Sequence, residues 1–136
     1  MGKKINYSGW RRDKVVRLFL KDKCRYNWNK VHETIKANGN LGFFKNKIEH
    51  FSYRSYDHYM AKLNHYAALR ANELYDKGVR VNLYHILVKP PVRFLIHYIV
   101  RLGFLDGFAG FLIARTQAYG VLTRYIKLWL LTHKLK

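Results

Sequence analysis

Two short clusters that combine histidine with other polar side chains are the best candidates for chemistry in this sequence. The first is the pair His32 and Glu33. An imidazole beside a carboxylate can transfer a proton, coordinate a divalent cation or orient a hydroxyl group. Successive side chains of a strand point to opposite faces, so both groups enter one site only if a turn begins here. An ordinary pair of surface residues is the alternative.

The second cluster is the segment His50-Phe51-Ser52-Tyr53-Arg54-Ser55, where a predicted strand runs into a predicted helix. Helix N-termini attract anions, so a phosphate group held near Ser55 with Arg54 beside it is one interpretation. The alternative is structural, with Ser55 capping the helix and Tyr53 packing against it. The sequence leaves both interpretations open.

Several motifs of common enzymes are absent from the sequence. It has no Gly-x-Ser-x-Gly, no Walker loop and no Gly-x-Gly-x-x-Gly. Its aspartates stand apart, so no Asp-x-Asp can hold a metal diphosphate, and its other histidines lack metal-site spacing. The single cysteine, Cys24, excludes an intrachain disulfide and fits a cytoplasmic setting. We expect no metal site formed by this chain's own residues.

The first part of the chain, residues 1–54, is predicted to be a small β-rich unit. Its apolar runs are short and rich in β-branched and aromatic residues, which favours strands, and Asn38-Gly39-Asn40 is typical of a turn. The predicted strands are Val15–Leu20, Cys24–Trp28, Val31–Lys36 and Ile48–Tyr53.

The second part, residues 55–136, has a helical pattern. Ser55 as N-cap, Asp57 in the first turn and Gly78 just past the end predict one helix. Lys89-Pro90-Pro91 is expected to break the stretch that follows, because proline lacks an amide hydrogen. Two apolar helices are predicted at about Val92–Leu102 and Phe108–Thr132, joined by a corner at Gly103–Gly107.

These patterns predict an α+β protein with three to four helices, of which the last two are apolar and membrane-associated. Small residues in the last helix would let another helix approach closely. They are Gly110, Ala114, Ala118 and Gly120.

The charge of the chain points to an anionic partner. There are 26 Lys and Arg residues against 8 Asp and Glu, giving a formal charge of +18, and 16% of the residues are aromatic. Such a surplus repels itself unless an anion compensates it. Nucleic acid, an anionic membrane leaflet and phosphorylated sugar carriers all qualify.

The distribution of charge favours the membrane over nucleic acid. In the last 57 residues, isolated cations lie among apolar side chains, and Asp106 is the single acid. Basic side chains of this kind extend to lipid headgroups while their stems stay in apolar surroundings. No run approaches the roughly 20 apolar residues that span a bilayer, and no signal peptide is expected. The predicted membrane-contact residues are Arg93, Phe94, Arg101, Phe104, Phe108, Phe111, Arg115, Arg124 and Trp129.

Several motifs, taken in order, resemble the distal catalytic region of bacterial family 2 glycosyltransferases. The closest group is the lipopolysaccharide core β-glucosyltransferases, and the resemblance covers nearly the whole chain from about Val15. The motifs that carry it are Arg17-Leu18-Phe19, Val31-His32-Glu33, Ile48–Ser55, Lys62–Ala67, Lys89-Pro90-Pro91, Gly103–Gly107 and Ala118–Trp129.

The resemblance implies a GT-A fold, whose distal half residues 1–54 would partly form, and transfer from a nucleotide-sugar to a lipopolysaccharide or lipid-linked acceptor. It further implies a divalent metal, Mg²⁺ or Mn²⁺, and a peripheral or monotopic place at the cytoplasmic face of the inner membrane. His32 and Glu33 match the family's His-Glu element and are carried over as catalytic residues. His50, Tyr53 and Arg54 match a segment that would bind substrate or phosphate.

The family's nucleotide-binding half and its Asp-x-Asp motif have no counterpart in the sequence. We therefore expect the metal ligands to lie outside this chain and the chain alone to be incomplete as an enzyme. Two explanations stay open: a split enzyme that works with a separate N-terminal catalytic chain, or a truncated remnant. Two other functions stay open at this point: a basic nucleic-acid-binding protein and a non-catalytic membrane adaptor.

Overall fold

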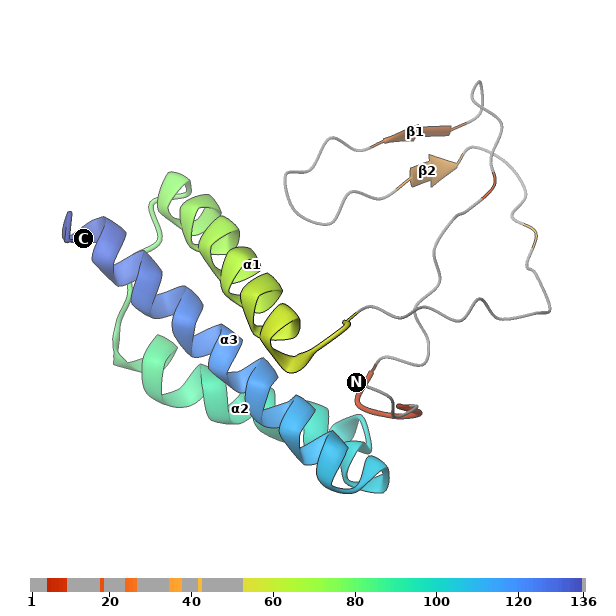
Figure 1. Cartoon of the computed structure of the whole chain (residues 1–136). Helices are drawn as coiled ribbons and strands as arrows, with labels where there is room; N and C mark the ends of the chain where they lie inside the picture. Colours follow the sequence, from red (N-terminus) through yellow and green to blue (C-terminus); the bar gives the residue numbers. More distant parts are fainter. Residues whose placement is uncertain are drawn as a thin grey trace.

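The computed structural model describes residues 5–9, 18, 24–26, 35–37, 42 and 53–135. Its main body is a set of packed helices in which α3 lies between α1 and α2 and contacts both (Figure 1). The helical elements, in order, are α1 (Tyr56–Asp76), the π-helical η2 (Tyr84–Val88), α2 (Lys89–Leu95), the π-helical η3 (Ile96–Val100), the 3₁₀ turn η4 (Gly103–Asp106) and α3 (Phe108–Thr132).

The predicted α+β class, with its small β-rich unit as a partial GT-A half, is wrong. Extended structure in the described residues is limited to β1 (Cys24–Tyr26) and β2 (Ile35–Ala37), which pair antiparallel with Cys24 opposite Ala37. Two strands of three residues cannot bury a core of their own. β-branched and aromatic residues favour strands only where a packed surface surrounds them, so their enrichment misled the prediction.

Few residues of the other predicted strands are among those that the structure describes. Leu18, inside the predicted strand Val15–Leu20, lies in a bend with its side chain 81% exposed. The predicted turn Asn38–Asn40 and most of Ile48–Tyr53 lie outside the described residues.

Helix α1 begins and ends where its capping residues predict. The Ser55 hydroxyl accepts a hydrogen bond from the His58 amide at 3.1 Å, and Asp57 lies in the first turn. At the other end Gly78 has a φ of +69°, the left-handed conformation that glycine adopts without strain. A stripe at four-residue spacing is buried on the side that faces α3. It consists of Tyr59, Leu63, Ala67 and Ala71.

The predicted break at the prolines is wrong. Pro90 and Pro91 occupy the first turn of α2, and the helical path continues into them from η2. The Lys89 amide donates to the Tyr84 carbonyl, five residues back, which widens the preceding turn. Proline is tolerated in the first turn because its missing amide hydrogen would have no partner in that helix. The element predicted at Val92–Leu102 therefore begins at Lys89.

The core lies where α1 and the segment after it meet α3. It is formed by Ala71, Val121, Tyr125 and Leu128, with Leu74, Val79, Val81 and Ile86 packed around it.

The small residues of α3 allow close approach, as predicted. A Cβ atom added at Gly110 would lie 1.8 Å from the Gly103 carbonyl oxygen, and one at Gly120 would meet Leu63 of α1 at 3.0 Å. Ala114 and Ala118 are also buried. These residues fix how closely η4 and α1 pack against α3.

Residues 5–9 dock on the corner formed by η3, η4 and the start of α3 (Figure 1). The carboxylate of Asp106 accepts the amides of Asn6 and Tyr7 at 3.0 and 2.9 Å, and the Ser8 amide donates to the Arg101 carbonyl at 3.0 Å. Gly9 has a φ of +85°, and the Arg101 side chain lies where a Cβ atom would stand. No local pattern predicts this contact, since about 100 residues separate the partners.

Candidate functional site

Part of the predicted catalytic set lies outside the described residues. His32, Glu33 and His50 are there, so their roles stay predictions. Tyr53 and Arg54 are described, at the N-terminal end of α1. The Tyr53 ring lies 4.5 Å from the Tyr59 ring, and burial, followed by the nearby Tyr66, raises the pKa of Tyr53.

These contacts give Tyr53 and Ser55 structural roles at the helix start. Arg54 is exposed, and its backbone amide donates to His58 Nδ1 at 3.4 Å. Phosphate binding by the Arg54 guanidinium stays a prediction.

The described chain contains a pocket whose polar lining is entirely basic or phenolic. We call it the basic pocket and define it by Lys89, Arg93, Arg124, Tyr84 and Tyr125. Its volume is about 190 Å³, and its apolar walls are Val92 and Ile96 on one side and Val121 on the other. Three elements supply its polar residues: η2, α2 and α3. No acidic side chain lines it.

Lys89 is held in place by the two tyrosines. Its ammonium donates to the Tyr125 hydroxyl at 2.7 Å and lies 4.8 Å from the centre of the Tyr125 ring and 5.7 Å from that of Tyr84. Aromatic faces attract cations, so these contacts fix the ammonium without neutralising its charge.

The two arginines of the basic pocket are less well satisfied. Arg93 Nε and Arg124 Nε are buried, and neither has a hydrogen-bond partner among the described residues. Burial lowers the pKa of both guanidiniums; the charge of Arg101 adds to this for Arg93, and the charges of Arg70 and Arg93 do so for Arg124. Arginine still stays protonated. The basic pocket therefore holds two partly buried cations whose Nε atoms have no acceptor among the described residues.

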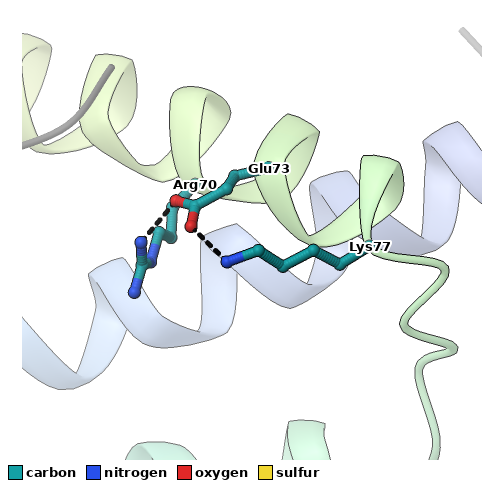
Figure 2. A network of polar contacts seen from close by, with 3 residues as sticks. All are labelled: Arg70, Glu73 and Lys77. Atoms are coloured by element: carbon teal, nitrogen blue, oxygen red, sulfur yellow. Dashed lines mark hydrogen bonds and ion pairs between the residues drawn. The ribbon is translucent and has the colours of Figure 1, made fainter. Parts of the chain in front are cut away.

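The nearest acid that acts on Arg124 is engaged elsewhere. Glu73 of α1 pairs with Arg70 and, at 2.7 Å, with Lys77, and these two contacts lower the pKa of Glu73 (Figure 2). Glu73 favours the charged form of Arg124 but does not line the basic pocket. One carboxylate shared by two other cations leaves the positive charge of the basic pocket in excess.

Four of the phenylalanines predicted to contact membrane come together at the corner. With Tyr98 they form what we call the aromatic cluster, which is linked by ring contacts between 5.3 and 6.3 Å. Phe108 is 73% exposed and Phe104 46%. The members of the cluster are Phe94, Tyr98, Phe104, Phe108 and Phe111.

The other predicted membrane-contact residues are scattered. Arg93 and Arg124 line the basic pocket. Arg101 lies over Gly9, and Arg115 is exposed on α3. Trp129 lies near the far end of α3 against His133, with 4.6 Å between ring centres. The nine residues therefore do not form one surface.

Sequence reasoning missed the environment of His97, which is 2% exposed. Its Nδ1 lies 3.0 Å from the Ser8 carbonyl oxygen, and because a carbonyl only accepts, Nδ1 carries the proton. Burial, then the charges of Arg93 and Arg101, lowers the pKa of His97 to about 4. A hint was available in the lone acid Asp106, since a single carboxylate in a basic segment needs a specific partner.

The described residues contain no group of three or more His, Cys, Asp or Glu side chains that could hold a metal ion. Asp106 already accepts hydrogen bonds from the N-terminal segment. The divalent metal implied by the resemblance therefore has no fitting site in this part of the chain. Within the same residues, no helix combines the length and apolar character needed to cross a bilayer.

Comparison with known proteins finds a relative of this chain among the glycosyltransferases. The chain is related to part of a glycosyltransferase: over an alignment of 111 residues it is 34% identical to the lipopolysaccharide core biosynthesis glycosyltransferase LpsC of Rhizobium meliloti. The match covers 79% of this chain but 41% of the relative, so the chain spans less than half the length of that protein. No family model and no solved structure matches the chain.

Proposed function

We propose that the chain is the membrane-surface region of a family 2 glycosyltransferase. The transferase passes a sugar from a nucleotide-sugar to a lipopolysaccharide or other lipid-linked acceptor at the cytoplasmic face of the bacterial inner membrane. The observation that carries the proposal is the aromatic cluster, exposed at one end of a helical body whose sequence is related to a lipopolysaccharide core glycosyltransferase.

The aromatic cluster has the properties of a surface that rests in a lipid interface. Exposed apolar side chains continue from it along η3 and the corner, including Ile99, Val100 and Leu105. Large exposed apolar patches mark interaction sites, and aromatic rings with nearby cations suit the headgroup region. The chain carries a formal charge of +18, which an anionic leaflet would compensate.

The other roles in the proposed reaction follow from the chemical groups that each step needs. His32 and Glu33 would orient or deprotonate the acceptor hydroxyl, since an imidazole and a carboxylate are the usual groups for this step. Donor binding and the divalent metal would come from a nucleotide-binding part outside these 136 residues. The helical body would hold the acceptor at the membrane surface next to that part.

Sugar transfer in membranes of the source cells tests the proposal. Deletion of the gene should abolish incorporation of label from the nucleotide-sugar into the lipopolysaccharide fraction, and the intact gene should restore it. The double variant Phe104→Ser/Phe108→Ser should restore about tenfold less incorporation than the intact gene, because it lacks both exposed rings that would enter the lipid interface.

Tyr75→Ser is the matched control, since Tyr75 is an exposed ring at the other end of the helical body. It should restore incorporation fully. Unchanged labelling after deletion would refute the transferase role, and full rescue by the double variant would refute the membrane-surface role.

A further inference from the structure

The basic pocket brings together three cations from two helices, and no acidic side chain lines it. Lys89 and Arg93 come from α2, and Arg124 comes from the facing part of α3. Like charges at close range repel one another, and burial in apolar walls strengthens the repulsion. This repulsion opposes folding, and an anionic ligand in the basic pocket would offset it.

The unpaired donor atoms indicate that this ligand is negatively charged. Arg93 Nε and Arg124 Nε are buried donors without acceptors among the described residues. A buried donor without a partner is costly, and native proteins rarely leave one without a reason. An anion in the pocket would supply acceptors to both guanidiniums and compensate their charge.

A phosphate group fits this set of donors better than a carboxylate does. Guanidinium forks bind the oxygens of either group in pairs, whereas three cations match a group that carries more than one negative charge. Lys89 adds a further point charge and the Tyr84 and Tyr125 hydroxyls add neutral donors. Since a single water needs about 10–15 Å³ of such space, the volume of about 190 Å³ has room for a phosphate group with several waters.

We propose that the basic pocket is a phosphate-binding site, with Arg93 and Arg124 as its main ligands and Lys89 as a third. The phosphate would belong either to a lipid headgroup or to a soluble phosphorylated molecule. The site does not depend on the proposed sugar transfer: unchanged labelling after deletion of the gene, together with phosphate binding by the chain, would refute that function and leave this site intact.

Titration of the full chain with inorganic phosphate in a calorimeter tests the site directly. The wild-type chain should bind with saturation at low salt. Arg93→Gln and Arg124→Gln should each weaken binding about tenfold or more, because each removes charge-assisted hydrogen bonds. The phosphate affinity of Arg93→Lys should lie between those of the wild-type chain and Arg93→Gln, since the charge stays but the planar guanidinium is lost.

Arg80→Gln is the matched control, because Arg80 is an exposed arginine in the connection after α1 and lies outside the pocket. It should change phosphate affinity less than about twofold if binding is local rather than a response to net charge. Thermal melts verify folding: phosphate should raise the melting temperature of the wild-type chain and of Arg80→Gln but not that of the two glutamine variants.

Vesicles identify the source of the phosphate. Phosphatidic acid in phosphatidylcholine vesicles should bind the wild-type chain and be displaced by inorganic phosphate if the ligand is a headgroup. If vesicle binding is equal in Arg93→Gln and wild type while inorganic phosphate still needs Arg93, the ligand is soluble. The proposal is overturned if neither phosphate nor vesicle binding depends on Arg93 or Arg124 more than on Arg80.

Discussion

Among single residues, His97 links the fold most directly to pH. It is buried, its Nδ1 donates to the Ser8 carbonyl oxygen, and Arg93 and Arg101 act on it electrostatically. Burial, then the charges of Arg93 and Arg101, lowers the pKa of His97 from 6.5 to about 4, although the hydrogen bond to Ser8 acts in the opposite direction. Between these values the unfolded chain binds a proton that the folded chain excludes.

We therefore predict that the free energy of unfolding falls as the pH drops from about 6.5 towards 4. The contribution of His97 to stability is fully present above the pKa that this residue has in the unfolded chain. As the pH falls towards the lower pKa of the folded chain, this contribution, on the order of a few kcal/mol, is lost. In His97→Gln the free energy of unfolding should depend less on pH in this window. Urea unfolding at a series of pH values measures the difference.

His65→Gln is the control for this experiment, because His65 is exposed on α1. Its stability should follow the wild-type dependence on pH, including the part due to carboxylates. Parallel curves for wild type and His97→Gln would show that burial of His97 is not coupled to folding.

Among the elements, the corner between η3 and α3 is the most tightly constrained. The backbone of η4 passes so close to α3 that Gly110 has no room for a side chain. Leu102 enters the corner with a φ of +56°, which is uncommon for a residue other than glycine. The corner also carries Asp106 and so holds residues 5–9 in place.

Gly110→Ala is predicted to destabilise the chain by about 2 kcal/mol or more, because the added methyl group meets backbone that cannot move aside. Gly42→Ala is the control, since a Cβ atom there would meet nothing within 4 Å. Chemical unfolding of both variants provides the comparison. An equal effect of the two substitutions would contradict the close approach of η4 to α3.

The sequence predicted elements well where local chemistry decides them. Ser55 and Gly78 bound α1, and the run from Phe108 to Thr132 is α3. The prolines misled the prediction because they lie in the first turn of α2, where the missing amide hydrogen is tolerated, and the π-helical η2 leads directly into them. The β-rich unit was wrong because strand preference depends on neighbouring surfaces that a single sequence does not reveal.

The candidate sites were less accessible to sequence reasoning. The nine predicted membrane contacts include Phe94, Phe104, Phe108 and Phe111, which lie together in the aromatic cluster, and their contact with a membrane stays a prediction. The basic pocket was missed, because its lining extends from Tyr84 to Tyr125 and only the packing of α2 on α3 brings it together. Arg93 and Arg124 had been grouped with the membrane contacts by composition alone.

On the scale of the whole molecule, the aromatic cluster and the basic pocket lie on the same helical pair. The cluster takes Phe94 and Tyr98 from α2 and η3, and the pocket takes Arg93 and Ile96 from the same stretch. An apolar surface and a phosphate site built by one pair of helices would suit an acceptor that carries both lipid and phosphate. This arrangement unites the proposed function with the further inference.

Flotation of the full chain with vesicles of phosphatidylglycerol, compared with phosphatidylcholine alone, tests the membrane-surface proposal most directly. We predict binding to the anionic vesicles that weakens with salt, and an affinity about tenfold lower for Phe104→Ser/Phe108→Ser but not for Tyr75→Ser. The membrane-surface proposal is contradicted if the wild-type chain floats with neither kind of vesicle. It is also contradicted if the double variant binds as tightly as the wild-type chain.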